Sequence, residues 1–226
     1  MQIVQLSERP FTQWTAFDET LPGHSCQEIL SMRIWNGRVP IARERYTEDR
    51  IVCVLRGCIS ISTETKKIKR SFHAPGSQFV IPAHSNIRFS ADSECMTVHF
   101  PWRQNMGTIE TAATSKKGNF AKWLFRGFGL GDREAAIIAW ERSGQSEPHD
   151  HSNAEFQGVF SGRLHQHFWM DECPARTIHD AGTVAHIPAG RRHVVRAPVE
   201  AVSMMYYYEG PVQMNTLSDF VLVDID

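Results

Sequence analysis

The feature that most constrains the fold of this 226-residue chain is an internal duplication. Four pairs of identical residues recur at a separation of 105 or 106 positions, and one inserted residue between the second and third pairs accounts for the difference. Such self-similarity indicates that two copies of one structural unit follow each other in the chain. The pairs are Trp35 and Trp140, Gly57 and Gly162, Gly76 and Gly182, and Pro82 and Pro188.

Both halves have the local pattern of strands. Residues 29–35 and 51–63 are short runs rich in β-branched and apolar side chains, interrupted by Gly37, Pro40 and Gly57. Residues 135–140 form a similar run that predicts a buried strand in the second half. Helical periodicity sustained over a dozen residues is hard to find, so the sequence predicts strands and turns.

Composition narrows the class of protein. Hydrophobic residues make up 42% and charged residues 22% of the chain, as in globular proteins, and the net charge of −1 gives no reason to expect nucleic acid or membrane as a partner. The amino-terminal sequence MQIVQLSERP does not resemble a signal peptide, and no apolar run reaches 18 residues. The five cysteines form no CxxC motif, which favours a reducing compartment. We expect a cytoplasmic protein with a small-molecule partner, and leave a homodimer open.

The second half contains four side chains that suit a metal ion. His149, His151 and Glu155 stand in PHDHSNAEFQGVFSG, and His193 ends the later run GTVAHIPAGRRH. Because alternate side chains of a strand share a face, His149 and His151 point the same way. Imidazole suits Zn, Cu, Fe and Ni and carboxylate suits harder ions such as Mn, so the mixed set admits several divalent metals.

The spacing of these residues resembles the two motifs of the cupin superfamily. The matching positions are the His-x-His pair, Glu155 and Gly162 in the first motif, and Gly182, Pro188, Gly190 and His193 in the second. One position departs from the usual pattern, because Ala197 stands where the family usually has Asn. The resemblance implies a small antiparallel β-barrel that holds one divalent ion, Fe, Mn, Ni or Zn, through His149, His151, Glu155 and His193.

Together with the duplication, the resemblance implies an all-β protein made of two tandem jelly-roll barrels, a bicupin. We expect one barrel in residues 1–112 and one in residues 113–226, with the polar stretch 103–119 between them. Alignment of the halves places Glu44, Tyr46, Arg50 and Ile87 at the four ligand positions of the first barrel. Arginine and isoleucine offer no donor to a cation, so we expect that barrel to serve as a scaffold without metal. The alternative is a charged ligand pocket of Glu44, Tyr46, Arg50 and His84.

Three further residues are candidates for a role in catalysis. Gln157 shares its strand face with Glu155, Tyr206 lies in a run that ends in three tyrosines, and His186 stands between Gly182 and Pro188. An amide or a phenol orients a substrate by hydrogen bonds, although packing in the core is the commoner use of a tyrosine. His165 and His167 imitate the His-x-His pair but lack the other motif residues, so we interpret them as histidines on a strand face.

The resemblance leaves the reaction open among three classes. The first is a dioxygenase similar to quercetinase-type cupins, with a metal ion that holds an enol or enolate beside O₂. The second is a redox-neutral isomerase, lyase or cyclase in which the ion polarises a carbonyl. The third is a metal-containing protein that binds a small molecule without turnover. We favour the dioxygenase because the motif contains no dedicated base apart from the ligands.

Overall fold

The computed structural model describes most of the chain. The described residues are 2–8, 11–18, 27–35, 42–63, 69–91, 93–101, 107–112, 119–128, 130, 132–170, 173–207 and 213–217. Their regular secondary structure consists of β-strands, as the sequence predicted. A helix long and apolar enough to cross a membrane is not found in this part of the chain.

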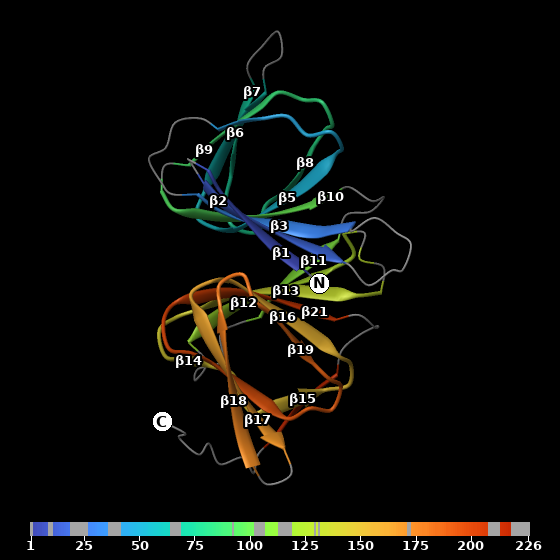
Figure 1. The fold of residues 1–226 in the computed structure, drawn as a ribbon. Coiled ribbons are helices and arrows are strands. Elements are labelled where there is room, and N and C mark those ends of the chain that lie inside the picture. The colour runs from blue at the N-terminus through green and yellow to red at the C-terminus, as the bar shows by residue number, and fades with distance from the viewer. Residues whose placement is uncertain are drawn as a thin grey trace. The chain divides into compact units, whose positions relative to one another are not determined.

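The chain divides into two compact units, Met1–Gly107 and Thr108–Asp226. The strands of the first unit are β1 (Gln2–Glu8), β2 (Phe11–Asp18), β3 (Gln27–Trp35), β4 (Ala42–Glu44), β5 (Arg50–Arg56), β6 (Ile59–Thr63), β7 (Lys69–His73), β8 (Gln78–Ile81), β9 (Ile87–Ser90) and β10 (Cys95–Pro101). They form two antiparallel sheets, with strand orders β1-β2-β3-β10-β5-β8 and β4-β9-β6-β7. Figure 1 shows the two sheets of this unit facing each other around an interior.

The second unit repeats this arrangement. Its strands are β11 (Thr108–Ala112), β12 (Phe120–Arg126), β13 (Glu134–Trp140), β14 (Gly144–Gln145), β15 (His149–His151), β16 (Glu155–Ser161), β17 (Arg163–Met170), β18 (Cys173–Asp180), β19 (Val184–Ile187), β20 (His193–Ala197), β21 (Ala201–Tyr207) and β22 (Met214–Thr216). One sheet has the order β11-β12-β13-β21-β16-β19, which matches the larger sheet of the first unit strand by strand. The other has the order β18-β17-β20-β15-β22, with β14 paired to β20.

The position of β11 corrects the boundary expected from the sequence. Residues 108–112 were assigned to the first half and to a polar connecting stretch, but they form a strand that pairs with β12 from Thr108 opposite Arg126 to Ala112 opposite Lys122. Polar composition alone does not identify a linker, because an edge strand is also rich in polar side chains. The second unit therefore begins at Thr108.

The duplicated residues have the same structural task in each unit. Gly57 and Gly162 both have positive φ angles, of 71° and 76°. A Cβ at either position would lie 2.3 or 2.1 Å from the backbone oxygen of Glu94 or Glu200, so only glycine fits these turns. The repeat in the sequence therefore marks a repeated backbone requirement.

Apolar side chains make up most of the interior of each unit. Strands β10 and β21, each central in its sheet, are buried at every position, including the polar side chains of Thr97, His99 and Ser203. In the second unit Ile138, Val159 and Met205 belong to one buried cluster. Burial of such side chains is the main favourable term in folding, at about 25 cal/mol for each Å² of apolar surface.

Candidate metal centre

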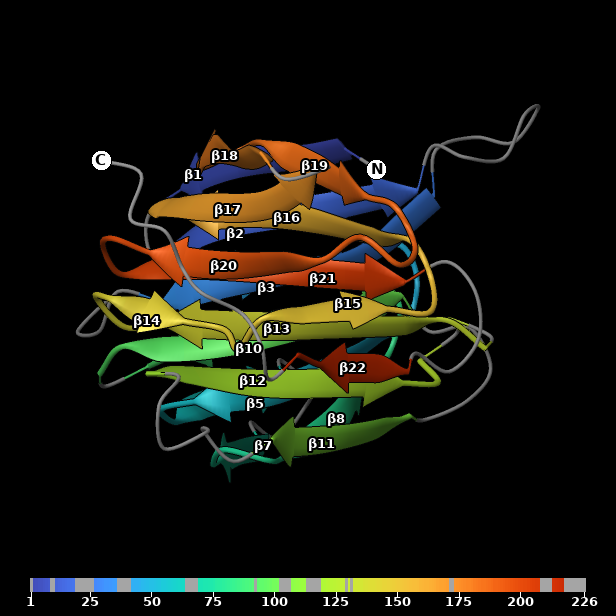
Figure 2. The ribbon, with the colours of Figure 1, turned by 90° about the horizontal axis from the view of Figure 1, so that it is seen from below.

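Three strands of the second unit bring the predicted ligands together. His149 and His151 lie on β15, Glu155 begins β16 and His193 begins β20. His149 and His193 are directly paired across the antiparallel strands β15 and β20, which Figure 2 shows side by side. The three imidazole rings have centroids 4.3 to 4.9 Å apart, and one nitrogen of each lies within 4.8 Å of the others.

Two backbone carbonyls orient the imidazoles. His149 Nδ1 donates to the carbonyl oxygen of Glu147 at 2.6 Å, and His193 Nδ1 donates to that of Arg191 at 2.8 Å. Both rings therefore present Nε2 as the acceptor, because a neutral imidazole has one protonated nitrogen. Hydrogen bonds of this kind fix the tautomer of histidines that bind metals.

Glu155 lies beside the histidines, and the set of donors fits a metal ion. Its Oε2 atom is 3.2 Å from His151 Nε2, and both side chains are completely buried. Within the described residues, His151 Nε2, His193 Nε2 and both oxygens of Glu155 are buried without a hydrogen bond of normal geometry. A buried polar atom without a partner is costly, and a divalent ion shared by these atoms would satisfy all of them.

The buried environment changes the protonation of these groups in a way that suits a cation. Burial, with smaller contributions from His193 and Lys122, lowers the pKa of His149 to about 4. Burial and the neighbouring His149 and His193 lower the pKa of His151 to about 2. Burial raises the pKa of Glu155 to about 7, although Lys122 acts in the opposite direction. At neutral pH the imidazoles are therefore neutral, with lone pairs available for a metal.

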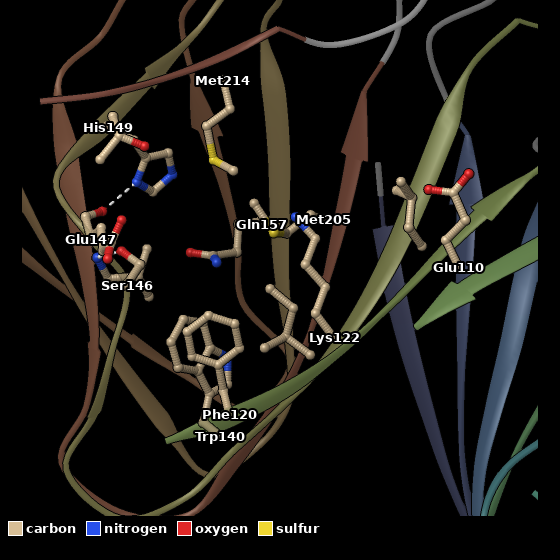
Figure 3. A pocket seen from close by; sticks show the side chains of 14 residues that line it. Glu110, Phe120, Lys122, Trp140, Ser146, Glu147, His149, Gln157, Met205 and Met214 are labelled. Carbon is tan, nitrogen blue, oxygen red and sulfur yellow. Dashed lines mark hydrogen bonds between the residues drawn. The ribbon is translucent and has the colours of Figure 1, made fainter. Parts of the chain in front are cut away.

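The centre opens on a cavity of about 360 Å³ inside the second barrel. Figure 3 shows His149 and Gln157 on its wall, together with Phe120 and Trp140. Five of the other lining side chains are apolar, namely Leu124, Ile138, Val195, Met205 and Met214, and five are polar, namely Glu110, Lys122, Ser146, Glu147 and Thr216. This volume and this combination of apolar and polar side chains suit a site for a small molecule.

Gln157 is the candidate for a catalytic role that the structure places in this cavity. It is buried, lines the cavity and lies on the same face of β16 as Glu155 and Val159, as the strand alternation predicted. Its Oε1 accepts a hydrogen bond from Gln166 Nε2, and its Nε2 has no partner among the described residues. The amide nitrogen is therefore available to donate to a ligand.

The other two candidates lie away from the centre. The Tyr206 hydroxyl accepts a hydrogen bond from Arg133 Nη1 at 2.9 Å, and Tyr206 lies on the opposite face of β21 from Met205 and Tyr207, which belong to the barrel core. His186 is exposed on β19, where its ring packs against Phe156. The sequence did not show which way Tyr206 points, because both faces of β21 carry large apolar or aromatic side chains and no polar alternation marks the internal one.

The second His-x-His pair, His165 and His167, does not belong to the metal centre. His165 and His167 lie on β17 opposite Arg196 and Val194 and are not part of the histidine cluster, in agreement with their interpretation as histidines on a strand face. Tyr208 lies outside the described residues.

The structure adds Tyr207 and Lys122 to the site. The Tyr207 ring lies against His151, with centroids 5.4 Å apart, and its hydroxyl interacts with the carboxyl of Glu155. Lys122, on β12, lines the cavity, and burial lowers the pKa of its amine. The sequence contained one indication of an internal Lys122, because it shares a strand face with the apolar residues Phe120 and Leu124. The neighbouring face carries Trp123 and Phe125, so the sequence did not show which face is internal.

In the first barrel charged groups replace the metal ligands. Glu44 accepts a hydrogen bond from Arg33 Nη1 at 2.5 Å, and the same nitrogen donates to the Tyr46 hydroxyl at 3.1 Å. Arg50 pairs with Glu28 at 2.6 Å. Two guanidinium groups at this place oppose the binding of a cation and favour a structural role for the cluster.

The proposed charged pocket of the first barrel has one member outside this cluster. His84 is exposed and has a positive φ of 60°, and its contact with Tyr46 is a hydrogen bond between backbone groups. Its side chain does not join the ion pairs of Glu44 and Arg50. The pairing between opposite charges supports the interpretation as a structural network.

Comparison with known proteins shows the fold of the chain. No family model matches the sequence, and no curated protein matches it. Among solved structures, vicilin from Corylus avellana has a TM-score of 0.54 at 10% identity over 96% of this chain and 86% of that one. The 7S globulin of Momordica charantia has a TM-score of 0.52 at 12% identity over 96% and 85%. Oxalate decarboxylase from Bacillus subtilis has a TM-score of 0.49 at 13% identity over 95% and 76%.

The matches to vicilin and the 7S globulin, together with the antiparallel sheets, establish a fold of two tandem jelly-roll barrels of the cupin type. The expected fold class is therefore confirmed. Identity of 10 to 12% supports the fold alone, so the chemistry must be argued from the site. Ala197, the departure from the second motif, is completely buried and fills a core position of the second barrel.

Proposed function

We propose that the second barrel is a metal-dependent enzyme that acts on a small organic molecule rich in oxygen. The observation that carries this proposal is the convergence of three neutral imidazoles and Glu155 beside a mainly apolar cavity. A six-coordinate ion held by four protein ligands would keep two positions for a substrate or water, as catalytic sites require. A bound Fe, Mn, Ni or Zn ion supplies Lewis-acid chemistry, and the redox-active metals also supply oxygen chemistry.

The reaction we place first is dioxygenation of an enol or enolate, as in quercetinase-type cupins. Phe120, Trp140 and Met205 form an apolar part of the cavity wall, and apolar walls help to exclude water from reactive species. Gln157 Nε2 is free to donate to a substrate oxygen, and it cannot ionise, so it orients the substrate at any pH.

A second candidate is a redox-neutral isomerase, lyase or cyclase, and Lys122 is the observation that favours it. The amine lies in the same cavity, and burial lowers its pKa, which brings it closer to the range in which lysine exchanges protons. The sequence argument for the dioxygenase assumed that no base was present apart from the ligands. Because Lys122 is such a group, that assumption no longer holds, and a reaction that proceeds by proton transfer becomes an alternative to dioxygenation.

Oxygen dependence separates these candidates. Purified protein is analysed for metal and then mixed with a flavonol or a 1,3-dicarbonyl compound in an oxygen electrode, with an anaerobic parallel. A dioxygenase consumes one O₂ for each substrate molecule and is inactive without oxygen, whereas an isomerase or lyase converts its substrate in both conditions. His151→Ala is the control for metal-dependent turnover. Metal-loaded protein that binds these compounds but converts none of them would favour the non-catalytic binding protein.

We also propose a cytoplasmic location and a small molecule as the partner. The net charge of −1 and the five cysteines without a CxxC motif support this. A strong affinity for DNA or for anionic vesicles at physiological salt would contradict it.

A further inference from the structure

Lys122 is the cationic residue among those that line the cavity of the second barrel. Its side chain makes no hydrogen bond or close ion pair with the described residues, and Figure 3 shows it extending from β12 into the cavity. A lysine on a solvent-facing strand would keep its ammonium in water. Here the strand alternation places Lys122 on the internal face, between Phe120 and Leu124. An ammonium group held in an apolar cavity requires a counter-charge.

Nearby carboxylates do not supply a close partner. Glu155 interacts with Lys122 through space, but its oxygens point to the histidines, where the metal ligands gather. Glu134 also attracts Lys122, yet its carboxylate is bound by Arg126 Nε. The ammonium group therefore remains available to a ligand with a negative charge.

The walls of the cavity define the rest of such a ligand. Phe120 and Trp140 line the cavity with ring centroids 4.8 Å apart. Trp140 is held in place because its Nε1 donates to Ser203 Oγ at 2.9 Å. Fixed aromatic walls and a volume of about 360 Å³ suit a flat apolar body of the size of one aromatic ring with a short substituent.

The mouth of the cavity limits the charge of the ligand to about one unit. Glu147 lines the cavity and is exposed, whereas the exposed Glu110 is paired with Arg126, so one carboxylate without a close counter-charge stands on the solvent side. Repulsion from like charges disfavours a ligand with a second negative group directed toward solvent. One internal cation and the carboxylate of Glu147 at the mouth therefore match a monoanion.

We propose that Lys122 Nζ binds the anionic group of the substrate, and that the substrate class of this site is an apolar, ring-sized monocarboxylate or enolate. This inference rests on the proposed function, because it names the substrate class of the same site. It concerns recognition and holds for the oxygen-dependent and the redox-neutral reaction alike. A charge-assisted hydrogen bond in an apolar site should favour the anion over a neutral isostere by about tenfold or more.

The test measures binding rather than turnover. The affinities of 3-phenylpropanoate and of its neutral amide, 3-phenylpropanamide, are measured by titration calorimetry with the full chain, both metal-free and loaded with Zn²⁺. The carboxylate should bind about tenfold more tightly than the amide in both forms of the protein. Lys122→Met, which keeps the length of the side chain, should abolish this preference and leave the affinity for the amide within about twofold.

A matched control removes a positive charge elsewhere in the second unit. Arg163 is exposed on β17, where it pairs with Asp180, and it does not line this cavity. Arg163→Gln should retain the preference for the carboxylate. Equal affinities for the two compounds in the wild type, an unchanged preference in Lys122→Met, or no binding of the carboxylate would overturn the proposal.

The same experiment separates this proposal from the proposed function. If the carboxylate is preferred over the amide only in the Zn²⁺-loaded protein, the metal ion binds the anionic group and the role proposed for Lys122 is wrong. A preference that depends on Lys122 in protein without metal, combined with no turnover of any substrate, would retain the anion site and reject the enzyme. Circular dichroism of Lys122→Met confirms that the barrel is folded.

Discussion

His149 and His193 lie directly opposite each other on antiparallel strands, with ring centroids 4.3 Å apart. The equivalent cross-strand pair of the first barrel is Glu44 and Ile87, on β4 and β9. The two barrels therefore share the backbone register at this position and differ in side-chain chemistry alone. Because the duplication preserved the register, the loss or gain of a metal site required changes to only a few residues.

We predict one divalent ion for each chain, bound by His149, His151, Glu155 and His193. Replacement of His151 by Ala should remove most of the metal, because His151 is completely buried and its nitrogens have no other partner among the described residues. Metal content is measured by mass spectrometry after gel filtration. His165→Ala, which alters the other His-x-His pair, should retain the ion. Full occupancy in His151→Ala would disprove the assignment.

Glu44 should matter for stability and not for metal binding. Its carboxylate pairs with Arg33, which is only 5% exposed, so Glu44→Gln removes a negative charge that lies beside a buried guanidinium. We expect a loss of about 3 kcal/mol in the free energy of unfolding. Denaturant unfolding measures this loss. A metal content of two ions for each chain in the wild type, or loss of metal in Glu44→Gln, would show that the first barrel binds a cation.

Metal affinity should rise with pH as Glu155 ionises. Burial raises the pKa of Glu155 to about 7, while the pKa values of His149 and His151 are lowered to about 4 and 2. At pH 6 the imidazoles are already neutral, so binding should release about one proton, from Glu155, and almost none above pH 8. Calorimetry in buffers with different ionisation enthalpies measures this number. Glu155→Gln should bind metal weakly and release no proton.

For the metal-free protein, ionisation of Glu155 acts in the opposite direction: it lowers the stability of the fold as the pH rises. A carboxyl group whose pKa is raised from 4.5 to about 7 holds its proton more tightly in the folded than in the unfolded state. Its contribution therefore favours the fold at low pH and is lost as the pH rises from 4.5 to about 7. In Glu155→Gln this part of the pH dependence of the unfolding free energy should disappear.

Gln157→Leu should keep the metal and weaken the substrate interaction. Gln157 lines the cavity, its Nε2 has no partner among the described residues, and its Oε1 is bound by Gln166. Turnover, or the affinity for 3-phenylpropanoate, should fall by about tenfold. If the residue instead only supports the ligands, metal affinity should fall and substrate affinity at saturating metal should be unchanged. Full activity with full metal would place Gln157 outside the mechanism.

The sequence by itself determined the features that depend on spacing and backbone geometry. The period of 105 or 106 residues predicted two like units, because residues such as Gly57 and Gly162 meet a requirement that no other residue type satisfies. The motif spacing predicted that His149, His151 and His193 would meet, and alternation on β16 correctly placed Gln157 on the face of Glu155. These inferences rest on the strand period of two, which is local.

Tertiary structure alone decided which face is internal in strands that carry large apolar or aromatic side chains on both faces. Tyr206 and Tyr207 are adjacent in a strand that is buried throughout, and only the packing of β21 shows that Tyr207 reaches Glu155. The orientation of Lys122 was likewise decided by packing, since both faces of β12 carry aromatic side chains. The ion pair of Arg33 and Glu44 was also beyond the sequence, because these residues lie on strands of two different sheets, and their contact depends on how the sheets pack.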